Sequence, residues 1–276
     1  MNNATAITTI TRALEDKPDI RALFLGGSYG VGLEDAYSDL DFIAVTTSGP
    51  TDAFASLWHE AVSQTGEIVL WWDRQVKPML INAVTADWLR VDVQIVTPAQ
   101  TAQLTRSGLK ALFDHDRIYD DLAPTLAVSE PNLRRLQWQF EEFIRILGLL
   151  PLAMGRHEYI NAVTGTFHLR NLLIDLLIEE TAAPNRGGAL HLNRLITREQ
   201  RDLLEALPAL TPSREAVVPA YLAYATAYLP RARRFAQSLG IEWPGRLEEA
   251  MWARLKNELA SERPRVAHST ARVMPK

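Results

Sequence analysis

Residues 20–45 read IRALFLGGSYGVGLEDAYSDLDFIAV, two short apolar runs separated by a turn-rich segment. The first run ends abruptly at Gly27 and Ser28, and the second begins at Asp41. Apolar runs of this length, bounded by glycine and polar residues, are typical of buried strands. A strand that ends in glycines exposes backbone N–H groups, which attract anions. We therefore expect a phosphate group to bind at this turn.

The chain around this stretch alternates between helical and extended patterns. Such alternation predicts an α/β (α+β) domain with a mixed sheet, which we place at residues 1–125. The expected helices cover residues 5–14 and 53–62, with a short one from 98, and the expected strands cover residues 20–25, 41–45, 67–72, 79–84, 88–96 and 110–113.

From Asn132 onward, apolar residues recur at helical spacing and β-branched alternation disappears. This change predicts an all-α helical domain over residues 126–262. We expect residues 263–276, which are polar and basic, to form a poorly ordered tail. Proline and glycine separate the expected helices, which cover residues 133–150, 167–180, 198–207, 216–228, 231–239 and 246–260.

The composition excludes several classes of protein. With 47% hydrophobic and 22% charged residues, the chain is neither disordered nor fibrous. The absence of cysteine excludes disulfides, thiolate metal sites and a cysteine nucleophile. The start of the chain has no signal-peptide pattern, and no apolar run is long enough for a bilayer. We therefore expect a cytoplasmic protein with no membrane partner.

The net charge of −4 is unevenly distributed along the chain. Residues 1–125 carry 9 Lys and Arg against 17 Asp and Glu, whereas residues 126–276 carry 20 against 16. Nucleic-acid binding depends on clustered Lys and Arg, so we do not expect a nucleic-acid partner for the acidic half. An excess of carboxylates suits metal ions or a cationic substrate, although a solvated acidic surface would give the same count.

Three acidic residues stand out from this background. Asp39 and Asp41 are two positions apart at the start of a strand, so both carboxylates lie on one face. Carboxylates this close repel each other unless a cation lies between them, and magnesium is the cation that carboxylates share with phosphate oxygens. Asp92 lies in an otherwise apolar strand, where a lone acid is costly unless it is paired or metal-bound.

Each of these features alone is typical of ordinary turns and solvated strand ends. Together, in this order and spacing, they resemble the polymerase-beta-like nucleotidyltransferases. The resemblance lies in Gly27-Ser28 followed by Gly32, in Ser38-Asp39-Leu40-Asp41 leading into a strand, and in Asp92 flanked by valines. The chain length and the helical second half are similar to those of the aminoglycoside and lincosamide nucleotidyltransferases.

This resemblance implies a metal-dependent transfer of a nucleoside monophosphate, usually AMP from ATP, to a hydroxyl of a small acceptor such as an antibiotic. It implies that Gly27 and Ser28 hold the β- and γ-phosphates, and that Asp39 and Asp41 hold magnesium. Asp92 would complete a second metal site, act as the general base, or do both. Two alternatives remain open: a protein or RNA acceptor, as in toxin–antitoxin systems, and a regulator that binds nucleotide without transferring it. The sequence leaves the oligomeric state open.

Two weaker candidates accompany these acids. Trp71 and Trp72 lie on opposite faces of a strand, so at most one of them can stack on a ligand. Asn171 and Asp175 interrupt an apolar helix four residues apart, a spacing that favours a structural hydrogen-bond network over a binding site.

Overall fold

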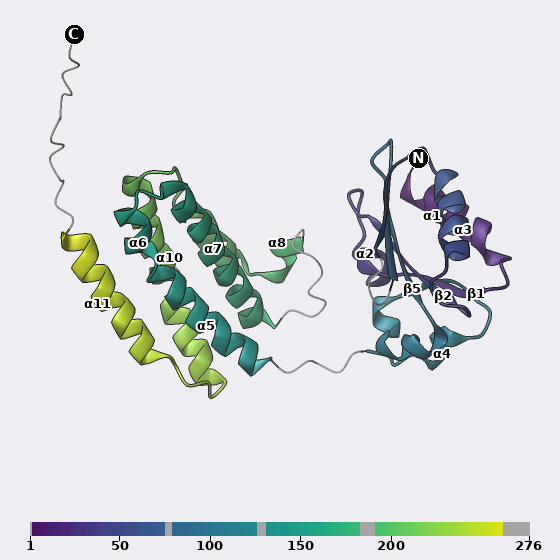
Figure 1. Ribbon diagram of the computed structural model, residues 1–276. Coiled ribbons are helices and arrows are strands. Elements are labelled where there is room, and N and C mark those ends of the chain that lie inside the picture. Colours follow the sequence, from purple (N-terminus) through teal and green to yellow (C-terminus); the bar gives the residue numbers. More distant parts are fainter. Residues whose placement is uncertain (1, 75–78, 126–130, 183–190, 262–276) are drawn as a thin grey trace, which may run out of the picture. The chain divides into compact units, whose positions relative to one another are not determined.

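The computed structural model describes residues 2–74, 79–125, 131–182 and 191–261, and the chain divides into two compact units, Met1–Ser129 and Glu130–Lys276 (Figure 1). The predicted tail at residues 263–276 lies outside the described residues. Each unit has its own hydrophobic core.

The first unit is built on a six-stranded mixed sheet with the strand order β3-β4-β5-β2-β1-β6. Figure 1 labels three of these strands, β1, β2 and β5. The neighbouring central strands β2 and β5 are parallel, and the other neighbouring pairs are antiparallel. The strands are β1 (Ile20–Leu25), β2 (Leu40–Thr46), β3 (Ile68–Arg74), β4 (Met79–Thr85), β5 (Arg90–Val96) and β6 (Lys110–Asp114).

Two helices cover one face of this sheet. They are α1 (Asn3–Glu15) and α3 (Asp52–Ser63), whose N-caps are the side chains of Asn2 and Thr51. Their apolar residues pack with alternate residues of the strands, and Trp58 of α3 is fully buried beside Phe42 of β2. Because neighbouring residues of a strand point to opposite faces, this packing fixes which side chains of β2 and β5 face away from the helices.

The opposite face is covered near β1 and β6 by a smaller apolar cluster that includes Phe24, Ile43 and Leu122. Short elements follow β5 and β6 on the chain, namely η1 (Pro98–Gln103), η2 (Arg106–Gly108) and α4 (Ile118–Asp121). The apolar residues of β3 and β4 on this face do not belong to that cluster, and Trp72 of β3 is 51% exposed. This part of the face is therefore accessible.

The predicted α/β (α+β) class with a mixed sheet is confirmed, followed by an all-α region. Several strand boundaries differ by one or two residues, and β5 begins at Arg90 rather than at Trp88. Trp88 has a φ of 64° and lies in the turn that joins β4 to β5. That left-handed conformation is incompatible with an extended strand, so the residue closes the hairpin instead.

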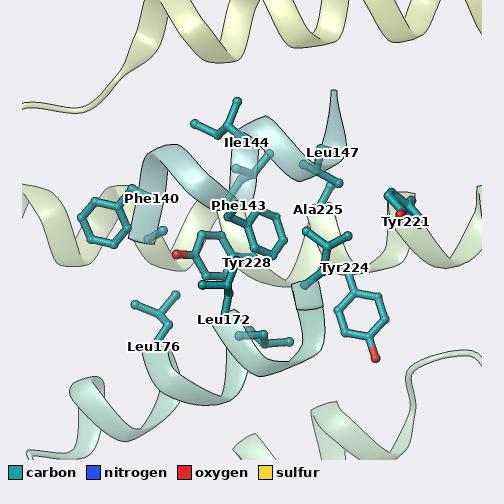
Figure 2. Close-up of a cluster of buried hydrophobic side chains, with 14 of the residues drawn as sticks. Phe140, Phe143, Ile144, Leu147, Leu172, Leu176, Tyr221, Tyr224, Ala225 and Tyr228 are labelled. Atoms are coloured by element: carbon teal, nitrogen blue, oxygen red, sulfur yellow. The ribbon is translucent and has the colours of Figure 1, made fainter. Parts of the chain in front are cut away.

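The second unit consists of helices: α5 (Leu133–Leu147), α6 (Leu150–Gly155), α7 (Tyr159–Thr181), α8 (Leu192–Leu195), α9 (Arg198–Glu205), α10 (Arg214–Ser238) and α11 (Gly245–Ser261). Their apolar faces meet in a core in which the rings of Phe143 and Tyr228 stack with a centroid distance of 3.6 Å (Figure 2). Tyr228 also donates a hydrogen bond to the carbonyl of Gln139 at 3.4 Å.

Three helix predictions for this unit were wrong. The predicted helices 216–228 and 231–239 are one helix, α10, which continues through Pro219 and Pro230. Each proline removes a backbone donor, but burial of α10 against α5 and α7 stabilises the helix enough to continue. The predicted helix 133–150 breaks at Gly148, because Pro151 favours the first turn of a new helix, α6.

The third difference is that α7 begins at Tyr159 rather than at Phe167. Gly165 lies inside the added turns, where the hydroxyl of Tyr221 on α10 occupies the space a β-carbon would need. That hydroxyl donates a hydrogen bond to the carbonyl of Ala162 at 3.1 Å. The glycine therefore allows α7 and α10 to approach closely, which offsets its poor helix propensity.

Within the described residues, no helix is both long enough and apolar enough to cross a bilayer.

Candidate active site

Two carboxylates meet on the central parallel strands. The register of β2 and β5 places Asp41 directly opposite Asp92, on the face of the sheet that α1 and α3 do not cover. Side chains opposite each other on neighbouring strands are about 5 Å apart at their β-carbons. The flanking residues Phe42 and Val93 point into the helix-covered core and are buried. The structure thus brings Asp41 and Asp92 together, as the sequence analysis expected, while their roles stay a prediction.

The glycine-rich turn lies against this pair. Gly26 donates a backbone hydrogen bond to the carbonyl of Asp41 at 2.8 Å, and the single-turn helix α2 (Gly27–Gly30) follows. Gly27 has a φ of 52°, and a β-carbon there would collide with the carboxylate of Asp41. Only glycine fits this close approach without strain. The turn and the carboxylate are therefore direct neighbours.

Ser28 adds a hydroxyl to this turn. Its Oγ atom is buried and has no hydrogen-bond partner among the described residues. A buried hydroxyl without a partner costs free energy, so such groups usually serve a ligand, a water or an ion. The backbone N–H groups at the start of a helix also lack partners within the helix. The turn therefore presents donors to an anion beside Asp41.

Asp39 occupies a different position from the other two acids. It precedes β2 and forms an ion pair with Arg90 at the start of β5, with 3.4 Å between a guanidinium nitrogen and a carboxylate oxygen. The guanidinium of Arg90 also donates a hydrogen bond to the carbonyl of Tyr37 at 3.5 Å. A cation of the protein thus lies at the edge of the acidic cluster, which the sequence analysis did not foresee.

The electrostatics of the cluster favour binding of a further cation. Burial raises the pKa of Asp41 to about 6, and the negative charges of Asp39 and Asp92 add to the rise. Burial also raises the pKa of Asp92, although a hydrogen bond with Asn82 acts in the opposite direction. Both shifts mean that negative charge here is insufficiently compensated by the protein. A bound cation would supply the missing compensation.

Asn82 of β4 is a site residue that the sequence analysis missed. It pairs directly with Asp92 in the antiparallel register of β4 and β5, and its side chain hydrogen-bonds that carboxylate. Its Oδ1 atom is buried without a hydrogen-bond partner in the described part of the chain. The hairpin turn between β4 and β5 could have indicated this residue. The length of such a turn fixes which residues of the two strands pair, and here it pairs Asn82 with Asp92.

The two tryptophans of β3 separate as expected. Trp71 faces the helices and packs against His59 of α3, with 4.8 Å between ring centroids. Trp72 pairs with Asn82 and therefore lies on the face that carries the carboxylates. The guanidinium of Arg74 lies over the Trp72 ring, 5.0 Å from its centroid.

The residues present are consistent with magnesium, and the pair Asp41 and Asp92 is the part of the expected acidic set whose strands are directly paired. Among the described residues, no three His, Asp or Glu side chains converge closely enough to hold a metal ion. Asp39 is paired with Arg90, which leaves Asp41 and Asp92 adjacent. Magnesium commonly binds one or two protein carboxylates and completes its shell with water and substrate phosphate. Asp41 and Asp92 are two such carboxylates, and the turn beside them presents hydrogen-bond donors that suit a phosphate.

Comparisons with known proteins give similarities in structure. No protein-family model and no curated protein sequence matches the chain. An aminoglycoside 6-adenyltransferase from Bacillus subtilis is similar in structure, with a TM-score of 0.43 and 11% identity over 93% of this chain and 97% of that one. A nucleotidyltransferase-like protein from Exiguobacterium sibiricum has a TM-score of 0.39 and 15% identity over 93% of this chain and 88% of that one.

Two polar side chains of α7 contact charged residues of α5. His168 lies 3.2 Å from a carboxylate oxygen of Glu142, and Asp175 lies 3.9 Å from the guanidinium of Arg135. Asn171, predicted to form a network with Asp175, is exposed. The contact of Asp175 is therefore with α5, a neighbouring helix, and links two elements of the bundle.

Proposed function

We propose that the chain is a magnesium-dependent nucleotidyltransferase that transfers a nucleoside monophosphate, AMP from ATP in the first instance, to a hydroxyl of a small acceptor. The observation that carries the proposal is the parallel register that places Asp41 opposite Asp92 while Gly27 lies against Asp41. An anion-binding turn next to a carboxylate pair is what a metal-bound triphosphate needs. A cytoplasmic location, where ATP is available, belongs to the same proposal.

In this reaction the glycine-rich turn binds the part of the triphosphate that leaves. The backbone N–H groups near Gly27 and the unpartnered hydroxyl of Ser28 donate hydrogen bonds to the β- and γ-phosphates. Asp41 and Asp92 would hold magnesium, and Asp39 would join them once its ion pair with Arg90 is broken. When bound, magnesium offsets the charge of the triphosphate and of the leaving pyrophosphate.

The acceptor hydroxyl must lose its proton as it attacks. A bond forms between the acceptor oxygen and the α-phosphorus, and the bond from that phosphorus to the pyrophosphate oxygen breaks. In this proposal Asp92 accepts the proton or completes the magnesium site, since a carboxylate within hydrogen-bond reach of the hydroxyl suffices as a general base. Asn82 holds the Asp92 carboxylate in position through its hydrogen bond.

The test is release of pyrophosphate from ATP and magnesium in the presence of an acceptor panel, with mass detection of the nucleotidylated product. The panel contains aminoglycosides, lincosamides and nucleosides. Asp41→Asn and Asp92→Asn should lower turnover at least 100-fold while the circular dichroism spectrum is retained, since one carboxylate of the pair is lost. Asp73→Asn is the matched control, because Asp73 is an exposed acid of β3 that points to the opposite face.

Full activity in either site variant would contradict the assignment of the carboxylate pair. Binding of ATP without pyrophosphate release across the whole panel would instead favour a nucleotide-binding regulator. Modification of a protein or RNA with no modification of small molecules would support the other alternative acceptors.

A further inference from the structure

Four side chains lie in one row across the sheet. Trp72 of β3 pairs with Asn82 of β4, which pairs with Asp92 of β5, which pairs with Asp41 of β2. Beyond Asp41 the row reaches the glycine-rich turn, since the backbone N–H of Gly26 bonds to the carbonyl of Asp41. Directly paired residues point to the same face, so the row forms a continuous track from the anion-binding turn to the exposed indole.

The position of the row relative to the glycine-rich turn indicates on which side of the α-phosphorus the acceptor binds. In an in-line displacement at phosphorus, the attacking oxygen and the leaving pyrophosphate lie on opposite sides of the phosphorus atom. If pyrophosphate leaves toward Gly27 and Ser28, the acceptor oxygen approaches from the side of Asp92. Strands are about 4.8 Å apart, so Trp72 lies about 10 Å beyond Asp92 along this line. A small acceptor whose hydroxyl reaches Asp92 therefore extends over Asn82 toward Trp72.

Trp72 and Arg74, at the β3 end of the row, can both contact such an acceptor. Trp72 is half-exposed, although large aromatic side chains at the edge of a polar site gain by being covered. The guanidinium of Arg74 lies over its ring, and guanidinium groups both stack on flat rings and donate paired hydrogen bonds to carboxylates and carbonyls. A polycation would meet the positive charge of Arg74 at this position.

Resting on the proposed function, we propose that Trp72 and Arg74 bind the acceptor, and that this acceptor is a hydroxylated molecule with a flat unsaturated ring and a carbonyl or acidic group. Trp72 and Arg74 contact the ring and the polar group, while Asn82, through its Oδ1, accepts a hydrogen bond from the molecule. The subsite disfavours polyamine sugars. It is separate from the nucleotide end of the row, so it determines acceptor choice and not ATP affinity.

The experiment is fluorine NMR of the full chain labelled with 5-fluorotryptophan. The chain contains seven tryptophans, and the Trp72→Phe variant identifies the Trp72 resonance by its loss. The probes are 4-hydroxybenzoate, which has the proposed chemistry, and kanamycin, a polycation without a flat ring. Both are added after a magnesium complex of α,β-methylene-ATP, whose binding is measured separately by calorimetry.

We expect 4-hydroxybenzoate to shift the Trp72 resonance and kanamycin to leave it unchanged. Arg74→Gln should weaken the binding of 4-hydroxybenzoate at least fivefold without changing the affinity for the nucleotide analogue. Asp73→Asn, on the same strand but the opposite face, should change neither.

Three results would overturn the inference. They are a Trp72 shift caused by the nucleotide analogue alone, a shift with kanamycin but not with 4-hydroxybenzoate, and no shift with either probe. Failure of the proposed function is read separately, from calorimetry with the nucleotide analogue and from pyrophosphate release with ATP: no binding of the analogue, or binding of ATP without pyrophosphate release, counts against the function and not against the subsite. If the analogue binds and Trp72 does not respond to the ring probe, the acceptor subsite alone is wrong.

Discussion

Replacing Asp41 by Asn should make the metal-free protein more stable at pH 8. Burial and two neighbouring acids raise the pKa of this carboxyl from 3.8 to about 6, which means that ionising it costs more in the folded than in the unfolded chain. The shift of about two units corresponds to about 3 kcal/mol at about 1.4 kcal/mol per unit. Because the side chain is partly exposed, solvent screening reduces this to about 1–2 kcal/mol.

The dependence on pH follows from the direction of the shift. Below pH 3.8 the carboxyl is protonated in both states, and its contribution to stability is fully present. As pH rises to about 6, the unfolded chain releases this proton first, so the free energy of unfolding falls. The stability gained by Asp41→Asn should therefore be small near pH 4, grow up to pH 6 and stay constant above it.

Urea unfolding followed by tryptophan fluorescence, in the presence of EDTA at pH 4, 6 and 8, measures this effect. Asp73→Asn should leave the midpoint unchanged at every pH. Addition of magnesium at pH 8 should then stabilise the wild type and not Asp41→Asn, because the ion binds the carboxylate pair. Equal midpoints for the wild type and Asp41→Asn at pH 8 in EDTA, or a lower midpoint for the variant, would refute the electrostatic reasoning.

Three further substitutions test other parts of the structure. Gly27→Ala should abolish nucleotide transfer and lower stability by about 1–3 kcal/mol, because its β-carbon collides with Asp41 and its φ is positive. Pyrophosphate release measures the first effect and urea unfolding the second. Gly165→Ala should lower the free energy of unfolding in urea by about 1–3 kcal/mol, since its β-carbon displaces the hydroxyl of Tyr221 and breaks the hydrogen bond from that hydroxyl to the carbonyl of Ala162. Adding Tyr221→Phe to Gly165→Ala should recover part of this loss, because the displaced hydroxyl is then absent. Glu248→Gln should cost about 1–3 kcal/mol at pH 7, because the buried carboxylate accepts hydrogen bonds from an arginine and two indoles; no difference between this variant and the wild type at pH 7 would show that these contacts are unimportant.

Local patterns in the sequence predict much of the first unit. Residues 20–25 form a strand with the expected bounds, and the alternation of Val91, Asp92 and Val93 correctly predicts which side chain faces away from the core. Patterns of this kind depend only on the period of a strand and on the burial of one face. They identify individual carboxylates without saying which strands become neighbours.

The parts of the site that sequence could not predict depend on pairing between distant segments. Asn82 and Trp72 belong to the site only because the strand register aligns them with Asp92. That register cannot be derived from a single sequence. The ion pair between Asp39 and Arg90 likewise joins residues far apart in the chain. In the second unit, packing of α10 outweighs the preference of Pro230 for a helix end.

The turn at residues 86–89 joins β4 to β5, and its length sets the register in which Asn82 pairs with Asp92, so the site is sensitive to the number of residues in this turn. A one-residue deletion that β5 accommodated by sliding would rotate Asp92 into the helix-covered core and bring Val93 to the opposite face. Natural or engineered changes of length in this hairpin should therefore be tolerated only where the turn itself absorbs them. This arrangement of strands is therefore more vulnerable to insertions and deletions in the hairpin than to substitutions.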